Sequence, residues 1–170
     1  MSGTVNLPPK TVRRSQVTMT EMVLPQHTNA LGSVFGGTVM SWVDIAAATC
    51  AMRHCARQVV TASVDALHFL APVRLGWIVT IQSSVNYVGG TSCEIGVIVR
   101  SENAITGETF HTASAYLTFV ALDSHSRPTA IPPLVLETED ERRRHGAAQI
   151  RRANRLKLKA EIHSRLGQNA

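Results

Sequence analysis

Residues 38–55 read TVMSWVDIAAATCAMRHC, and a helix formed by this stretch carries apolar side chains on nearly every face. A helix that is apolar all round is a buried helix. A short strand-like run at residues 16–23 precedes it, and four longer runs rich in Val, Ile, Thr and aromatic residues follow, at 59–69, 77–88, 92–101 and 108–122. One buried helix needs a surface that wraps it, so the sequence predicts an α+β fold in which a curved antiparallel sheet of about five to six strands encloses the helix.

Charge divides the chain of 170 residues into a body and a tail. From Arg142 onward nine Lys and Arg residues stand against the single acid Glu161, whereas residues 1–141 hold eight basic and eleven acidic residues. Acids at the start of the tail and bases further along suit the dipole of a helix. We therefore expect a flexible arm over residues 1–14, one domain over 15–136 and a basic C-terminal helix within 137–170.

Several classes of protein are disfavoured. The sequence has no stretch of the roughly 18 apolar residues that a membrane span needs, and no apolar signal-peptide segment near its start. Cys50, Cys55 and Cys93 form neither a disulfide framework nor a C-x-x-C pair, so we expect inert core thiols in a reducing, cytoplasmic compartment. There is no G-x-S-x-G elbow, phosphate-binding loop or H-E-x-x-H motif, and we expect no metal. With few aromatic residues interleaved, the basic tail is a poor match to a nucleic-acid site.

Asp44 is an unusual residue for a buried helix, because a carboxylate between Trp42 and the run Ile45–Ala48 is poorly solvated. It must be ion-paired, hydrogen-bonded or shifted in pKa. Two interpretations stay open on the residues alone. One is a structural carboxylate, bonded to loop amides or placed at an oligomer seam, and the other is a general base or nucleophile in a cleft.

The loop before this helix has the pattern N-x-x-G-x-x-x-G-G from Asn29 to Gly37. Amides at a helix N-terminus stabilise developing negative charge, and Gly36 and Gly37 allow a substrate carbonyl to approach them. Asn29 adds a neutral amide donor. A polarising loop and a carboxylate on one helix are the groups needed for attack on a carbonyl carbon.

These motifs, in this order, resemble the hotdog-fold acyl-CoA thioesterases of the YciA and brain acyl-CoA hydrolase type. The resemblance covers roughly residues 15–155. It rests on NALGSVFGG at 29–37 followed by Asp44, SVDALHFLAPVRLG at 63–76, GTSCE at 90–94, TGE at 106–108, FVAL at 119–122 and PPL at 132–134.

The resemblance implies a hotdog fold and hydrolysis of acyl-CoA to free CoA and a carboxylic acid, such as a fatty acid, with no cofactor beyond the CoA of the substrate. It also implies that two subunits join their sheets, that this dimer is the smallest active unit, and that three dimers form a hexamer. In the family the asparagine and the helix aspartate of one site come from different subunits. Asn29 of one chain and Asp44 of its partner are therefore the expected catalytic pair.

The phosphates of CoA need cations and hydroxyl donors around them. The residues that we expect to bind the substrate are Gly36, Gly37, Ser63, Ser92, Arg74, Arg100, Arg151 and Arg152. Two other functions stay open: a hotdog hydratase or dehydratase, which generally uses a histidine paired with an acid, and a non-catalytic module that binds CoA or a nucleotide.

Overall fold

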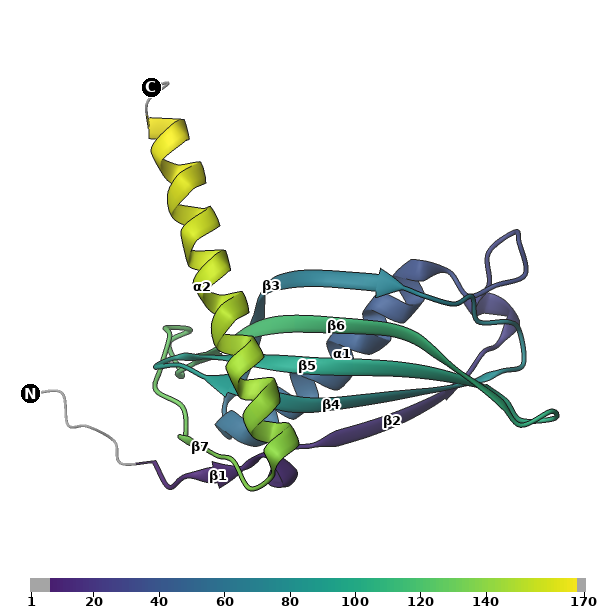
Figure 1. The fold of residues 1–170 in the computed structure, drawn as a ribbon, viewed down its shortest axis with the longest axis horizontal. Helices are drawn as coiled ribbons and strands as arrows, with labels where there is room; N and C mark the ends of the chain where they lie inside the picture. The colour runs from purple at the N-terminus through teal and green to yellow at the C-terminus, as the bar shows by residue number, and fades with distance from the viewer. Residues whose placement is uncertain (1–6, 168–170) are drawn as a thin grey trace, which may run out of the picture.

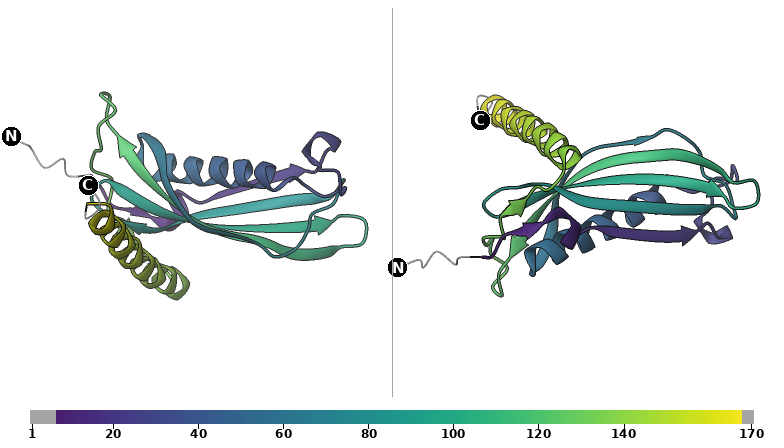
Figure 2. Two further views of the ribbon diagram at one scale, coloured as in Figure 1. Left: turned by 90° about the horizontal axis from the view of Figure 1, so that it is seen from above. Right: turned by 60° about the horizontal axis from the view of Figure 1, so that its bottom comes forward.

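Helix α1 (Gly36–Cys55) lies against one face of a five-stranded antiparallel sheet in the computed structural model, which describes residues 7–167. The sheet has the order β2–β4–β5–β6–β3, built from β2 (Val17–Met22), β3 (Gln58–Phe69), β4 (Ile78–Val88), β5 (Ser92–Asn103) and β6 (Glu108–Leu122). The sheet curves around α1 (Figures 1 and 2). The predicted α+β fold, with one long helix wrapped by a curved sheet, is confirmed.

The core between helix and sheet pairs small side chains with large ones. The helix contributes Ala46, Ala47, Cys50 and Ala51 and the sheet contributes Ile81, Ile95, Leu117 and Phe119, each at most 1% exposed. Interiors are close-packed, so the small residues allow the helix to approach the sheet closely. Burial of each large side chain contributes roughly 1.5–3 kcal/mol.

The boundaries of the elements follow local sequence signals. Helix α1 begins at Gly36 rather than at the predicted Thr38, because both glycines before Thr38 take part in its first turn. The predicted hairpin turns at Gly89–Gly90 and Thr106–Gly107 join β4 to β5 and β5 to β6. Gly107 has a φ of +77°, a conformation that favours glycine.

The C-terminus of α1 is closed by groups from other segments. Lys10 donates hydrogen bonds from Nζ to the carbonyls of Arg53 and His54, at 3.0 and 2.8 Å, and so places a positive charge at the negative end of the helix. The fully buried His54 ring lies with Nδ1 3.0 Å from the hydroxyl of Ser15 and Nε2 3.1 Å from the carbonyl of Pro132. These contacts join the helix end to the segments before β2 and after β6.

Part of the stretch expected to be a flexible arm contacts the body. Residues 1–6 lie outside the described residues. Strand β1 (Lys10–Thr11) pairs in parallel with β7 (Leu134–Val135), and Val12 is fully buried. Short 3-10 turns follow at Val12–Arg14 and, after β2, at Pro25–His27.

The predicted basic helix is α2 (Glu139–Gly167), which crosses the face of the sheet opposite to α1 (Figure 2). Its start is fixed by Glu141, whose Oε2 accepts the backbone N–H groups of Glu137 and Thr138 at 2.6 and 3.1 Å. Glu141 in turn donates its own N–H to the Thr138 hydroxyl at 3.2 Å, which completes a reciprocal cap. Neither α2 nor any other helix within residues 7–167 is long and apolar enough to cross a membrane.

Candidate active site

Asp44 lies in α1 on the side that faces the edge strand β3. Its Oδ1 accepts a hydrogen bond of 2.8 Å from the hydroxyl of Thr61, and no other hydrogen bond reaches this carboxylate within residues 7–167. The side chain is half-buried, and Met40 and Ile45 beside it on the helix are about half exposed. The carboxylate is thus oriented by one partner and open to a further one.

The loop before α1 holds Asn29 in a fixed orientation. Its Oδ1 accepts the backbone N–H groups of Leu31 and Ser33 at 2.9 and 3.4 Å and the Ser33 hydroxyl at 3.3 Å. The backbone of Asn29 also donates to the carbonyl of Ser33 at 2.8 Å. The Nδ2 amide group of Asn29 donates no hydrogen bond among the described residues, so it is free to donate to a ligand.

The N-terminus of α1 offers free amides next to this loop. Among the hydrogen bonds of the described residues, none is donated by the backbone amides of Gly36 or Gly37, and the preceding Phe35 supplies no side-chain cap. A Cβ at Gly37 would lie 2.5 Å from the Phe35 ring, so a larger residue there would displace that ring. Two free amides at the positive end of a helix are donors of the kind that an oxyanion site needs.

An apolar cavity of about 360 Å³ adjoins the same helix start. Its walls come from the start of α1 and from the segment that follows β3, and they include Val34, Val39, Phe69, Leu70, Pro72 and Val73. Phe69 packs 3.5 Å from the position of a Cβ on Gly36. A hydrocarbon group placed there would keep a neighbouring carbonyl close to the free amides.

Within one chain, no hydrogen bond joins Asn29 to Asp44 in the described residues. At a rise of about 1.5 Å per residue, Asp44 lies roughly 12 Å along the helix axis from Gly36. The uncovered surface around Asp44 continues onto β3, where Val64 is about half exposed. A single chain therefore presents the two predicted catalytic side chains on separate parts of its surface.

The predicted CoA-binding residues do not gather in one place. Arg74 is exposed and lies beside the Asn29 loop, since it forms a β-bridge with Ser33, whereas Arg100 is exposed on β5 and donates to Gln82. Ser92 is half-buried at the start of β5, and Ser63 is half-buried on β3. Arg74 is thus the predicted arginine that lies beside the Asn29 loop.

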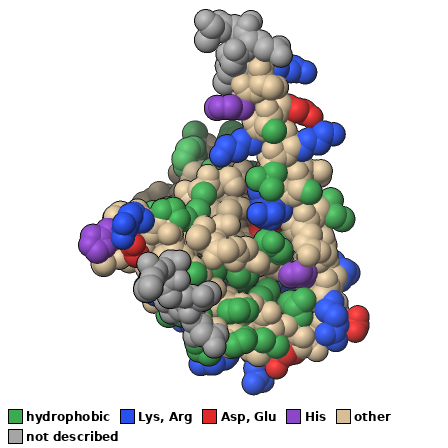
Figure 3. All heavy atoms as spheres, turned by 90° about the vertical axis from the view of Figure 1, so that its left-hand side faces the viewer, with side chains coloured by type: hydrophobic (Ala, Val, Ile, Leu, Met, Phe, Trp, Pro, Cys, Tyr) green, Lys and Arg blue, Asp and Glu red, His purple; other side chains and the backbone are tan. Residues whose placement is uncertain are grey.

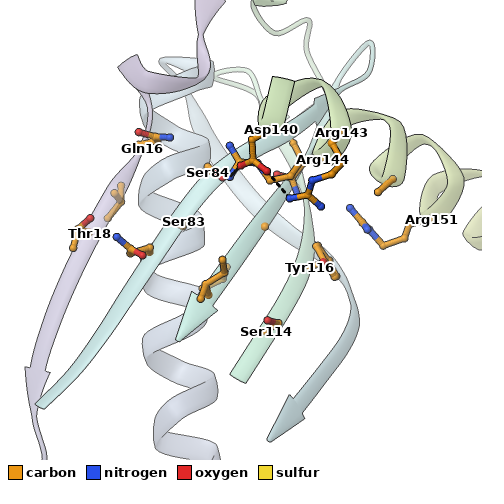
Figure 4. A pocket seen from close by; sticks show the side chains of 17 residues that line it. Gln16, Thr18, Ser83, Ser84, Ser114, Tyr116, Asp140, Arg143, Arg144 and Arg151 are labelled. Carbon is orange, nitrogen blue, oxygen red and sulfur yellow. Dashed lines mark hydrogen bonds and ion pairs between the residues drawn. The ribbon is translucent and has the colours of Figure 1, made fainter. Parts of the chain in front are cut away.

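Arg151 and Arg152 belong to α2, on the opposite face of the sheet. Arg151 donates from Nε and Nη2 to the buried carboxylate of Glu94, with a shortest distance of 2.6 Å, and its guanidinium lies 3.7 Å from the ring centroid of Tyr116. Arg152 lies over Tyr87 at 5.7 Å. Figure 4 shows Arg151 and Tyr116 at a polar pocket of about 370 Å³ between α2 and the sheet. Arg151 is therefore already paired within the fold.

The cysteines are buried in the core, as predicted. Burial raises the pKa of the Cys50 thiol to about 12. A hydrogen bond between Cys93 and Cys55 raises the pKa of Cys93 and lowers that of Cys55. Residues 7–167 contain no group of three or more His, Cys, Asp or Glu side chains that could hold a metal ion.

Thr61 is the residue of this site that the sequence did not reveal. Threonine is common in strands, so its presence in β3 carries no signal of its own. A register shift between Thr61 and Ser63 in the pairing of β3 with β6 marks an irregularity beside it, and this is visible only in the folded sheet.

Comparison with known proteins gives consistent results. The sequence profile of the thioesterase superfamily matches residues 31–108. The uncharacterized acyl-CoA thioester hydrolase YkhA of Bacillus subtilis is 42% identical over 158 residues, which cover 93% of this chain and 91% of that protein. A hexameric acyl-CoA thioesterase of known crystal structure is 38% identical with a TM-score of 0.88, over 91% of this chain and 99% of that one.

An acyl-CoA hydrolase from Staphylococcus aureus, solved with butyryl-CoA, CoA and CoA disulfide, is also similar. It is 34% identical with a TM-score of 0.86, over 94% of this chain and 97% of that one. Further structures of that hydrolase carry alanine in place of an asparagine, an aspartate and a threonine. Those three positions are spaced along that chain as Asn29, Asp44 and Thr61 are along this one.

Proposed function

The chain belongs to the thioesterase superfamily and is an acyl-CoA thioester hydrolase, and we propose that its active site combines Asn29 of one subunit with Asp44 and Thr61 of a second. The observation that carries this proposal is the separation of the two groups within one chain. Asp44 lies on an uncovered face of α1, and the asparagine loop lies at the helix start. A second copy that packs on the uncovered face brings its own loop to Asp44.

The thioester carbonyl binds at the N-terminus of α1 in the subunit that supplies Asn29. Its oxygen accepts hydrogen bonds from the free amides of Gly36 and Gly37, which become stronger as the carbonyl oxygen acquires charge in the transition state. One donor of this kind is typically worth about 3 kcal/mol. The free Nδ2 group of Asn29 orients the carbonyl or the attacking water.

Asp44 acts as the base for the attacking water. The water oxygen forms a bond to the carbonyl carbon while Asp44 takes the proton, the C–S bond then breaks, and the proton passes to the departing CoA thiolate. The products are a carboxylic acid and CoA. A positioned base contributes roughly 10²–10⁴-fold, and Thr61 keeps the carboxylate aimed at the water.

The apolar cavity beside Gly36 receives the acyl group or the neighbouring pantetheine arm, because it adjoins the oxyanion site and is lined by apolar side chains. Arg74 is the predicted arginine best placed for the CoA phosphates, since it is exposed beside the asparagine loop. Arg151 is less suited to this role, because Glu94 already neutralises it. The other predicted binding residues, Ser63, Ser92, Arg100 and Arg152, stay candidates.

The dimer is the smallest active assembly in this proposal. Strand β3 is an edge strand of the sheet, and a second β3 placed beside it in antiparallel orientation continues the sheet across a two-fold axis. The similar thioesterase of known structure is a hexamer, which supports a trimer of such dimers here. Within residues 7–167 the hydrogen-bond partner of Asp44 is Thr61 rather than a histidine, so the hydratase alternative gains no support.

Complementation between two inactive variants tests the shared site. N29A and D44A chains are each inactive alone in this proposal, yet a mixed dimer contains one intact site, made from Asn29 of the D44A chain and Asp44 of the N29A chain. Random exchange of equal amounts therefore restores about a quarter of the wild-type rate of thiol release from acyl-CoA. If the site lay within one chain, every chain in the mixture would be defective and mixing would restore nothing.

A further inference from the structure

The C-terminal half of α2 extends past the edge of its own sheet. Figure 1 shows the helix crossing β4, β5 and β6, passing β3, and continuing beyond this edge strand; Figure 2 shows the same projection from two further directions. The projecting part, residues 156–165, is exposed along its length. We call this part the α2 arm.

The α2 arm continues the face by which the helix binds its own sheet. On this face Ala148 is fully buried, and Arg151 and Arg155 bind Glu94 and Asp65 of the sheet. At 3.6 residues per turn the same face continues at Leu158 and Ile162. The face by which α2 binds its own sheet thus becomes apolar at the point where the sheet beneath it ends.

The two side chains on this continued face lack a surface to pack against. Leu158 is 58% exposed and Ile162 is 51% exposed. They line a groove of about 730 Å³ between the α2 arm and residues 62–65 of β3. Figure 3 shows hydrophobic and basic side chains together along the projecting helix.

A second copy of the chain supplies the missing surface. This inference rests on the proposed function, in which the β3 edges of two subunits pair. Pairing extends the sheet beyond β3, in the direction in which the α2 arm projects. The outer face of the partner's sheet then lies beneath the arm, where the chain's own sheet has ended.

The distribution of charge also favours a second copy of the chain as the partner of the α2 arm. Beyond the arginines already paired with the body, the α2 arm carries Lys157, Lys159 and Arg165 against Glu161 alone, whereas residues 15–136, which include the whole sheet, hold seven acidic against five basic residues. A basic arm and an acidic body attract each other across the two-fold axis.

We propose that the α2 arm docks through Leu158 and Ile162 on the outer face of the sheet of the partner subunit, and that two reciprocal arms hold the dimer together. The arm thereby contributes to the active site indirectly, since it fixes the distance between Asn29 of one subunit and Asp44 of the other.

Sedimentation velocity over a dilution series tests the proposal, with full-length wild type, the double variant L158E/I162E and the matched control A160E. Residue 160 lies on the opposite face of the same turn, so A160E adds charge to the arm without entering the contact. We expect L158E/I162E to release monomers at concentrations at least about tenfold above those for wild type, because two apolar contacts per arm are lost. A160E is expected to behave as wild type.

Hydrogen exchange of the unmodified protein provides a second readout. Amides of residues 156–165 are expected to be protected in the assembled protein, whereas a free projecting helix exchanges rapidly.

Three outcomes overturn the docking. The first is assembly of L158E/I162E at wild-type concentrations, and the second is its dissociation into intact dimers rather than monomers. The third is a rise in its KM with unchanged mass, which would assign the groove to the substrate. Failure of the N29A and D44A mixture to regain activity would instead contradict the shared site, so the two failures are distinguishable.

Discussion

Thr61 and Asp44 form the one side-chain hydrogen bond by which β3 contacts the candidate catalytic carboxylate. The threonine does not contact the reacting atoms in the proposed mechanism, and it acts by positioning Asp44. Its methyl group plays no part in the bond, so the contribution of the hydroxyl is separable from that of packing.

Removal of this hydroxyl is expected to lower turnover and to leave substrate binding nearly unchanged. A hydrogen bond to a charged group contributes about 1.5–3 kcal/mol, so kcat of T61V is expected to fall roughly 10- to 100-fold. T61S keeps the hydroxyl and is expected to stay within about threefold of wild type. Steady-state thiol release gives both constants, and a loss that T61S shares, or one confined to KM, would contradict the positioning role.

At the scale of elements, the end of α1 depends on a buried neutral histidine. Burial lowers the pKa of His54 below its usual 6.5, and the nearby Lys10 charge acts in the same direction, whereas the hydrogen bond to Pro132 opposes them. Neutral His54 donates from Nε2 to the carbonyl of Pro132 and accepts the Ser15 hydroxyl at Nδ1. Both ring nitrogens therefore have a hydrogen-bond partner in the neutral form.

The protein is therefore expected to lose stability as the pH falls below about 6.5. In that range the unfolded chain binds a proton at His54 that the folded chain does not, so the free energy of unfolding decreases as the pH falls. The contribution of neutral His54 to stability is fully present above this range. H54Q retains an Nε2 donor but does not titrate. Thermal unfolding measured across the range is expected to show a lower melting temperature for H54Q at neutral pH and a flatter pH dependence than wild type.

The sequence predicted the elements well because their signals are local. Alternating β-branched residues, glycine turns and an all-apolar helix are each contained in one segment, and they located β3 to β6 and α1 to within a few residues. Asn29 and Asp44 became candidates because a loop asparagine and a helix carboxylate stand out from their surroundings, and the resemblance to the hotdog thioesterases implied that they form a pair; their catalytic roles stay a prediction. Arg151 was different: whether a helix arginine meets CoA or a buried acid depends on Glu94, which lies 57 residues away and reaches it only through folding.

For the whole molecule, the proposed site makes activity a property of pairs of chains. A double variant N29A/D44A offers neither group to a partner. A dimer of wild type with this variant has two sites, and each lacks one of the two catalytic groups. An excess of the double variant is therefore expected to suppress the wild type once subunits exchange, as measured by thiol release per wild-type chain.

The single variant D44A makes the control for this suppression. In a dimer of wild type with D44A, Asn29 of the variant meets Asp44 of the wild-type chain, and one complete site forms for each wild-type chain present. The rate per wild-type chain is then the same as in the wild-type dimer, however large the excess. Because both variants assemble through the same surfaces, suppression by N29A/D44A without suppression by D44A arises only if the two residues act across the subunit boundary. An unsuppressed rate per wild-type chain in both mixtures would place the whole site within one chain.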